Sequence, residues 1–391
     1  MSSAPDMRML GGGQPAAIPA VQAVWRSRFQ ELLEDGAALD RALLNYDPPL
    51  GNPLFRETFA AFLKRECSWD VTADNIAILP SSQTAFFLLF NLLAGESATG
   101  RKRILLPLAP EYIGYANQGL GEEMFVAHRP IIEEHGAHEF KYRVDFDRLR
   151  LTPDIAAICV SCPTNPSGNV IDADEFARLR DLSRQHGIPF IVDNAYGHPF
   201  PNVIHTSFAP HWEPDMIFSI SMSKVGLPGV RTAMIVAPPD IVRALGRMNA
   251  IVSLANGNLG QALLQPLLRD DTVLRLSRET IRPFYRQKTE YAVGLLSSLL
   301  GEKTSWSLHA REGAFFLWLW LKEMKCTSAE FYQRLKQRRV LIIPGHYFFF
   351  GLNEPGWKHA QQCLRISVSQ NEKTVREGLE IFAEEAVKVS N

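Results

Sequence analysis

Lys224 is the residue with the clearest chemical potential in this sequence, because of the residues around it. The segment Ser219–Arg231 (SISMSKVGLPGVR) combines small hydroxyl side chains, the lysine, two glycines and an arginine. A lysine amine that its surroundings keep neutral can form a Schiff base with an aldehyde cofactor. The hydroxyl groups and Arg231 can hold a phosphate, since arginine offers a forked set of donors. The alternative is a surface loop with a lysine and an arginine by chance.

Two further segments can bind anions. Ser81–Thr84 (SSQT) opens a helical pattern directly after an apolar run, and a helix N-terminus offers free N–H groups and a positive dipole end. Its alternative is a simple N-cap. In Leu364–Val368 the alternation places Arg365 on the polar face of a strand, where it can bind a carboxylate through two parallel hydrogen bonds. Solvent exposure is the alternative for Arg365.

Several other chemistries lack their signatures. Gly11–Gly13 has neither the preceding strand nor the spacing of a dinucleotide fingerprint, and no H-E-x-x-H or G-x-S-x-G occurs. Cys159 and Cys162 form a C-x-x-C inside an apolar, strand-like run, and no second ligand pair exists among the five cysteines. We interpret them as core cysteines, and no metal site is expected.

Composition points to a globular enzyme or binding protein without nucleic acid or membrane as a partner. The 391 residues are 46% hydrophobic and 21% charged, with a formal net charge of −1 and no long basic run. No apolar run reaches the ~20 residues of a membrane span, and the N-terminus lacks the layout of a signal peptide. We expect a cytoplasmic location.

Short apolar runs alternate with helical patterns between about residues 76 and 240, which predicts a mostly parallel sheet covered by helices on both faces. One helix is predicted from a capping box at Asp172 and Glu175 to Gly187. The last third mixes strands and helices and predicts a smaller α+β domain. The expected strands are Ile76–Leu79, Arg103–Leu106, Ala156–Ser161, Pro189–Val192, Met216–Ile220, Thr232–Val236, Val340–Ile343 and Leu364–Val368.

The motif Ser221-x-Ser-Lys224, with Arg231 after it, resembles the lysine motif of the class I/II aminotransferases, which are fold-type I enzymes dependent on pyridoxal 5′-phosphate (PLP). Ser161–Gly168 (SCPTNPSG) is similar to the N-P-T-G signature, which implies that Asn165 bonds the cofactor's ring hydroxyl. Asp193-x-Ala-Tyr196 is similar to the D-x-A-Y segment. There the aspartate keeps the pyridine nitrogen protonated and the tyrosine bonds the ring hydroxyl, so that the ring can absorb electrons.

The same resemblance assigns the other cofactor contacts. Ser82 and Gln83 belong to the phosphate cradle with Ser221 and Arg231, although the family usually begins this turn with glycine where this chain has Ser81. Tyr112 matches the aromatic residue that stacks on the cofactor ring, and Tyr115 competes for that role.

Substrate binding and assembly are also implied. Arg365 resembles the arginine that binds the substrate carboxylate, and Gly13 the glycine whose backbone closes over it. Tyr46 resembles the tyrosine that reaches the phosphate of the neighbouring subunit, which implies a homodimer with shared sites. The expected organisation is an N-terminal segment of the small domain (1–44), a large PLP-binding domain with a seven-stranded type of sheet (45–274) and a small C-terminal domain (275–391).

The implied reaction is amino transfer between amino acids and 2-oxo acids, with Lys224 as covalent anchor and proton carrier. Runs such as CPTNPSGNVI and SKVGLPGVR are similar to members that use valine and pyruvate. The cofactor motifs do not fix which bond is broken, so another amino donor or a β-lyase reaction is the alternative. A non-catalytic PLP sensor would need an added DNA-binding module, and a cofactor-free α/β binding protein would leave Lys224 unmodified.

Overall fold

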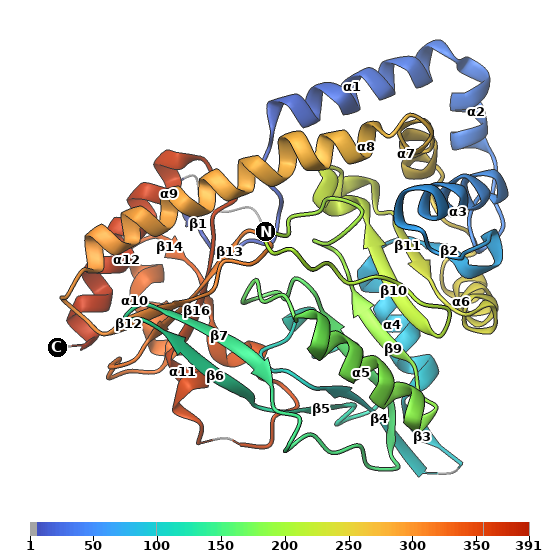
Figure 1. Cartoon of the computed structure of the whole chain (residues 1–391). Helices are drawn as coiled ribbons and strands as arrows, with labels where there is room; N and C mark the ends of the chain where they lie inside the picture. The colour runs from blue at the N-terminus through green and yellow to red at the C-terminus, as the bar shows by residue number, and fades with distance from the viewer. Residues whose placement is uncertain (1–5, 99, 355, 391) are drawn as a thin grey trace.

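The apolar runs in the middle of the chain form a central sheet of eight strands (Figure 1). The computed structural model describes residues 6–98, 100–354 and 356–390, so the first five residues of the expected N-terminal segment lie outside the described residues. In spatial order the strands are β2 (Ile76–Leu79), β11 (Ala233–Val236), β10 (Met216–Ser221), β9 (Phe190–Asp193), β8 (Ile155–Ser161), β4 (Gly100–Leu106) and β3 (Gly95–Ser97), with β5 (Phe125–Ala127) also paired to β4.

The central sheet is mostly parallel, as predicted. Strands β10, β9, β8, β4 and β5 run parallel, β11 is antiparallel to both of its neighbours, and β3 forms a short hairpin with β4. The register places Asp193 beside Ser161 on one side and beside Ser219 on the other. The ends of β8, β9 and β10 therefore meet at one edge of the sheet, which is where open α/β sheets bind their ligands.

A second, six-stranded sheet occupies the C-terminal part, and a hairpin from the middle of the chain extends it. Strands β6 (Pro130–His135) and β7 (Glu139–Val144) form this hairpin, and β7 pairs in parallel with β12 (Trp306–His309). The strand order is β15 (Ile343–Pro344), β16 (Cys363–Ser367), β13 (Phe316–Leu321), β12 (Trp306–His309), β7 (Glu139–Val144) and β6 (Pro130–His135).

The prediction of a single strand at Val340–Ile343 is wrong. It is divided into β14 (Val340–Leu341), which pairs with β1 (Arg8–Met9), and β15, which pairs with β16. The chain changes partner at Ile342, and a continuous apolar run gives no sign of such a change.

Local capping signals place the helices. Asp172 and Glu175 form the predicted capping box of α5 (Ala173–His186), which ends at Gly187 in the left-handed conformation. Helix α5 contacts β8 and β9, and α4 (Ser82–Leu93) contacts β2, β10 and β11 on the opposite face of the sheet (Figure 1). The other helices are α1 (Pro19–Glu34), α2 (Gly36–Leu44), α3 (Pro53–Cys67), α6 (Pro239–Val252), α7 (Leu259–Arg269), α8 (Thr272–Arg275), α9 (Arg282–Leu300), α10 (Ser328–Gln337), α11 (Lys358–Gln362) and α12 (Glu372–Ser390).

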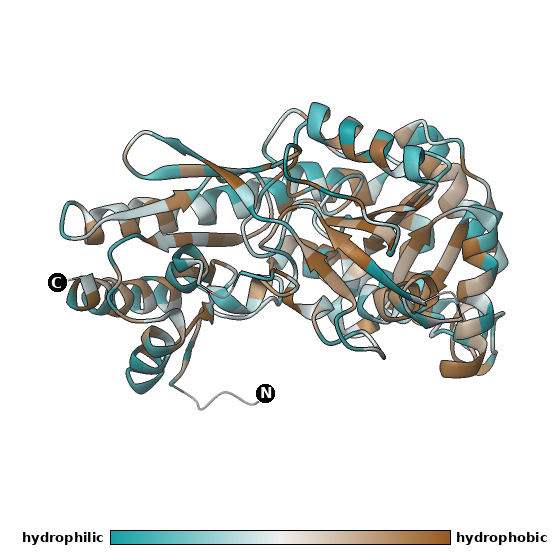
Figure 2. Cartoon of the chain, turned by 90° about the horizontal axis from the view of Figure 1, so that it is seen from below, coloured by the Kyte–Doolittle hydropathy of each residue, from teal (hydrophilic) through white to brown (hydrophobic). Residues whose placement is uncertain are grey.

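Apolar side chains fill the space between sheets and helices. Every residue of β2, β9, β10 and β11 is buried, and Figure 2 shows apolar (brown) strands in the interior of the molecule. Cys159 and Cys162 are buried free thiols, as predicted. Within the described ranges, no helix is long and apolar enough to cross a membrane, and no group of His, Cys, Asp and Glu side chains is placed to hold a metal ion.

Two glycines bring the sheets together behind the loop that follows β8. Gly168 has φ +73°, and a Cβ built on it would lie 2.5 Å from the carbonyl oxygen of Gly313 in the loop before β13. We expect Gly168→Ala to lower the free energy of unfolding by about 2–3 kcal/mol, because backbone strain and a steric clash add. Gly187→Ala is the matched control. It has φ +61° but open space around its Cβ, so strain alone applies and about 1 kcal/mol is expected.

Urea denaturation of both variants measures the difference. Equal losses for Gly168→Ala and Gly187→Ala would contradict the close approach of the two loops.

Candidate active site

A cavity of about 470 Å³ opens at the carboxyl ends of β8, β9 and β10. The structure brings nearly all of the predicted site residues to its wall, although they are spread over more than 350 positions of the chain. The predicted residues that line it are Gly13, Ser82, Gln83, Tyr112, Asn165, Asp193, Tyr196, Ser221, Lys224, Arg231 and Arg365. Tyr46 is the exception: it lies outside this wall and is 84% exposed.

Lys224 lies on the short 3-10 turn Met222–Val225 that follows β10. Its Nζ donates a hydrogen bond to the carbonyl oxygen of Gly13 at 2.7 Å. Burial and the nearby Arg365 and Arg231 lower the pKa of Lys224 to about 8, although Asp193 acts in the opposite direction. An appreciable fraction of this amine is therefore neutral near physiological pH, as a nucleophile or a base requires.

Helix α1 holds the lysine turn from behind. The indole Nε1 of Trp25 donates to the carbonyl oxygen of Val225 at 2.8 Å, and Gly226 ends the turn with φ +98°. A Cβ at Gly226 would lie 2.8 Å from the side chain of Val21, so glycine serves both the conformation and the packing there.

Asp193 ends β9 and is buried at the wall of the cavity. Burial raises the pKa of its carboxyl to about 6, while hydrogen bonds from the Tyr115 hydroxyl and the Ala195 N–H, and the charge of Lys224, act against this rise. These bonds are 2.7 Å and 3.2 Å long. Asp193 is therefore mainly ionised at neutral pH, and a cationic nitrogen in the cavity would be stabilised beside it.

Tyr112 and Tyr115, the two candidates for the stacking aromatic residue, lie in different places. Tyr112 lines the cavity, whereas Tyr115 is fully buried and donates to Asp193 from behind. Their rings meet edge to face, with centroids 5.1 Å apart. Only Tyr112 is placed to contact a ligand ring. The sequence does not predict that Tyr115 supports Asp193, because the spacing of the two tyrosines does not show which of them faces the cavity.

The N-terminus of α4 forms the anion-binding side of the cavity. Ser81 is the N-cap, and its Oγ accepts from the N–H of Thr84 at 3.0 Å, so the capping alternative holds for this serine. Ser82 follows in the cavity wall, and its Oγ accepts from the Ser219 hydroxyl at 2.8 Å. Ser221 and Arg231 line the same cavity. Free N–H groups, hydroxyls and a guanidinium together form a set of donors suited to a phosphate.

Arg365, from β16 of the second sheet, also lines the cavity. It is 5% exposed, so solvent exposure, the alternative in the sequence, is wrong. Its Nη1 donates to Oδ1 of Asn165 at 2.6 Å and its Nη2 to the carbonyl oxygen of Gly11 at 2.7 Å, while its buried Nε has no partner in the described part of the chain. Burial lowers the pKa of Arg365 to about 10, which still leaves it cationic at neutral pH.

Glu111 is a buried carboxyl that no sequence motif indicated. It accepts from the N–H of Ser161 at 2.7 Å, from the Ser161 hydroxyl at 2.8 Å and from the N–H of Tyr112 at 2.8 Å. Burial raises its pKa to about 8. Glu111 thereby joins two residues of the cavity wall. The seven lining residues that the sequence did not predict individually are Ser81, Phe86, Ile113, Ser161, Pro163, Ala195 and Ser223.

The raised pKa of Asp193 predicts a pH-dependent loss of stability. Because the pKa is about 6 in the folded chain and 3.8 ordinarily, the folded state favours the protonated carboxyl. The free energy of unfolding is therefore highest below about pH 4, where Asp193 is protonated in both states. It falls by on the order of 2–3 kcal/mol as the pH rises from about 4 through about 6. We expect ligand-free Asp193→Asn to unfold at higher urea concentration than the wild type at pH 7.5, with a smaller advantage at pH 4.5. If the stabilities of the wild type and of Asp193→Asn changed with pH in the same way, the buried charge of Asp193 would be contradicted.

Comparison with known proteins gives the family. Residues 14–382 match the model of the family described as aminotransferase class I and II. The chain is 45% identical to valine–pyruvate aminotransferase of Escherichia coli (strain K12), over 97% of this chain and 91% of that protein. The crystal structure of valine–pyruvate aminotransferase from Salmonella typhimurium LT2 is similar with a TM-score of 0.92 at 44% identity, covering 98% of this chain and 96% of that one.

A putative amino-acid aminotransferase from Psychrobacter arcticum 273-4 is similar with a TM-score of 0.96 at 39% identity, covering 99% and 93% of the two chains. Fold, cavity and sequence therefore agree on one conclusion: this chain belongs to the class I and II aminotransferases, with the fold-type I architecture.

Proposed function

We propose that this aminotransferase moves the amino group of valine to pyruvate, giving 3-methyl-2-oxobutanoate and alanine, with PLP bound at Lys224. The observation that carries the proposal is the convergence of a buried amine (Lys224), a buried carboxylate (Asp193) and a buried guanidinium (Arg365) on one cavity. The choice of valine and pyruvate is supported by the similarity to the two valine–pyruvate aminotransferases.

The groups around the cavity fit PLP. The N-terminus of α4 with Ser82 and Gln83, together with Ser221 and Arg231, offers donors to the phosphate. The buried carboxylate of Asp193 would pair with the protonated ring nitrogen. Asn165 and Tyr196 would bond the ring hydroxyl, and Tyr112 would cover a ring face. When bound, this cofactor supplies an aldehyde that takes up the amino group and a ring that withdraws electrons from the substrate Cα.

The chain supplies the proton transfer and the orientation. The Nζ of Lys224, whose pKa is about 8, takes the proton from the substrate Cα as a general base and later returns it. Arg365 binds the α-carboxylate that all substrates share, with Asn165 holding the guanidinium in place. Asp193 stays ionised at neutral pH and stabilises positive charge on the cofactor side of the cavity.

The lining of the cavity disfavours an acidic substrate side chain. Within the described ranges, the cationic side chains of the wall are Lys224, Arg231 and Arg365, and each already has a role in the proposal. A second carboxylate would lack a cation of its own, and its burial beside apolar groups is costly. An isopropyl group needs no such partner. A methyl group is tolerated too, because apolar pockets discriminate by only about 1–3 kcal/mol per methylene.

Large exposed apolar side chains support a homodimer. They come from α1, α2, the start of α3, the end of α6 and the residues just after it, and the exposed Tyr46 lies between α2 and α3 in the sequence. In a homodimer Tyr46 would contact the phosphate in the partner's cavity. The residues concerned are Leu33, Leu43, Leu44, Leu54, Ile251, Val252 and Leu254, each more than half exposed.

We also propose the division into residues 1–44 and 275–391 as the small domain and 45–274 as the large one. The pairing of β1 with β14 supports it, because this pairing connects the N-terminal segment to the C-terminal part. The hairpin of β6 and β7 belongs to the large domain in sequence but pairs with the C-terminal sheet.

Replacement of Lys224 tests whether this lysine binds PLP covalently. We expect Lys224→Ala to abolish amino transfer and to replace the absorption band of the lysine Schiff base by that of the free aldehyde form of PLP, because the variant lacks both covalent anchor and base. The far-ultraviolet spectrum should be unchanged. Lys64→Ala, at an exposed lysine of α3, is the matched control and should behave as the wild type. Turnover by Lys224→Ala near the wild-type rate would contradict the assignment.

A matrix of amino donors against oxo acceptors tests the substrates. With pyruvate as acceptor, we expect valine and 2-aminobutyrate to form alanine with kcat/KM values at least tenfold above those of aspartate and glutamate. Alanine formation is measured directly by chromatography. If glutamate or aspartate exceeds valine by tenfold, the substrate pair is wrong. Release of ammonia and a 2-oxo acid from an amino acid that carries a thiolate leaving group on Cβ, without alanine formation, would indicate the β-lyase alternative.

A further inference from the structure

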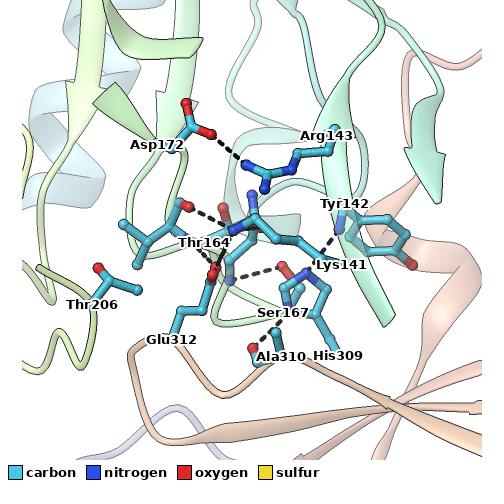
Figure 3. A network of polar contacts seen from close by, with 12 residues as sticks. Lys141, Tyr142, Arg143, Thr164, Ser167, Asp172, Thr206, His309, Ala310 and Glu312 are labelled. Atoms are coloured by element: carbon cyan, nitrogen blue, oxygen red, sulfur yellow. Dashed lines mark hydrogen bonds and ion pairs between the residues drawn. The ribbon is translucent and has the colours of Figure 1, made fainter. Parts of the chain in front are cut away.

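A buried ion pair outside the cavity wall joins β7 to the loop before β13 (Figure 3). Lys141 of β7 and Glu312 of the loop before β13 meet with Nζ 2.6 Å and 2.5 Å from the two carboxylate oxygens. Their side chains are only 8% and 16% exposed. Neither residue lines the cavity, and the proposed mechanism uses neither.

The pair holds the backbone of one turn from both sides. Lys141 Nζ also donates to the carbonyl oxygen of Val170 at 3.0 Å, and the N–H of Val170 donates to Glu312 at 2.9 Å. An apolar pair of similar size would leave both of these backbone groups without partners. A buried ion pair contributes little net stability, but its hydrogen bonds are directional, so it suits a backbone that must stay in one place.

Val170 is the exit of the turn that presents Asn165. The N–H of Thr164 donates to the carbonyl oxygen of Asn169 at 2.9 Å, and the N–H of Gly168 donates to the carbonyl oxygen of Thr164 at 2.7 Å. These bonds close the turn around Asn165, so its position depends on how the exit is held.

The C-terminal sheet holds both ends of this arrangement. Asn165 bonds Arg365 of β16, whereas the exit of its turn bonds Lys141 of β7, and both strands belong to the six-stranded sheet. Glu312 is itself fixed, because its carbonyl oxygen accepts from the N–H of His205 at 2.7 Å. The turn is therefore docked at two separate points of one sheet.

We propose that Lys141 and Glu312 are positioning residues for the substrate carboxylate: their ion pair fixes the turn so that Asn165 holds Arg365 in its binding orientation. The inference rests on the proposed function, in which Arg365 binds the carboxylate. Loss of the pair weakens binding of every substrate by the same factor, because the carboxylate is common to all of them. The side-chain preference stays unchanged.

Binding of 3-methylbutanoate to the PLP-loaded enzyme tests this step. This ligand has the carboxylate and isopropyl group of valine but no amino group to transfer, so calorimetry measures its Kd without turnover. We expect Lys141→Met and Glu312→Gln each to raise the Kd about tenfold, in the range for loss of alignment in a charged hydrogen bond. The KM for valine and the KM for pyruvate should rise by a similar factor, with a smaller change in kcat.

Arg143→Met is the matched control. Arg143 lies on the same strand and in the same polar network, where its guanidinium bonds Asp172 (Figure 3). It also bonds Glu133 and Glu175, and it makes no hydrogen bond to the turn of Asn165. Its Kd should remain within twofold of the wild type. A Kd for Lys141→Met no higher than that of the control would overturn the proposal.

A double variant separates positioning from general destabilisation. Each single substitution leaves one buried charge unpaired and is expected to lower Tm, whereas Lys141→Met with Glu312→Gln removes both charges and should recover most of the Tm. The Kd of the double variant should stay about tenfold raised, because the lysine contact to Val170 is still absent. Recovery of the Kd together with the Tm would overturn the proposal.

Arg365→Lys separates this inference from the proposed function. A lysine keeps the charge but not the fork of donors, so this variant should bind 3-methylbutanoate more weakly by tenfold or more. If its Kd equals that of the wild type, the carboxylate site of the proposed function fails. If it weakens binding while Lys141→Met does not, only the role of the ion pair fails.

Discussion

Lys224, Asp193 and Arg365 all keep ionisable groups in a place where little water reaches them, and much of the fold compensates for that loss of hydration. Burial disfavours the charged form of each group. For two of them this is opposed: Asp193 is held ionised by the Tyr115 hydroxyl and by the charge of Lys224, and the guanidinium of Arg365 donates to the oxygens of Asn165 and Gly11. For Lys224 the charge of Arg365 adds to the effect of burial, and only Asp193 opposes it. The result is an amine near its titration point beside a carboxylate and a guanidinium that are both charged at neutral pH.

The parallel strands make this arrangement possible. Because β8, β9 and β10 run in the same direction, their carboxyl ends deliver Ser161, Asp193 and Ser221 to one edge, within a register fixed by backbone hydrogen bonds. The second sheet contributes Arg365 to the same cavity. A site between two sheets needs a connection that keeps them in register with each other, and the polar contacts around Glu312 lie at that junction.

Much of this could be predicted from the sequence, because the relevant signals are local. Strand runs, the capping box at Asp172 and the motifs around Lys224 and Asn165 each occupy a few consecutive residues, and the structure places the predicted cavity residues together. The sequence could not predict the roles of four other residues, because their hydrogen-bond partners lie 50 to 171 positions away in the chain. These residues are Tyr115, Glu111, Lys141 and Glu312. The change of partner at Ile342 was hidden for the same reason: strand pairing is a long-range property.

The N-terminal segment gives the site a built-in competitor. The carbonyl oxygen of Gly11 already accepts from Arg365, and that of Gly13 accepts from Lys224. A carboxylate that takes the N–H of Arg365 now bonded to Gly11 therefore exchanges places with an oxygen of the chain itself. An apparent affinity for any substrate is then a difference between two binding events, one intermolecular and one intramolecular. The free energy of the intramolecular contact is the same for every substrate, so it does not change the order of preference among substrates. It does raise the concentration of each substrate that is needed for half-saturation.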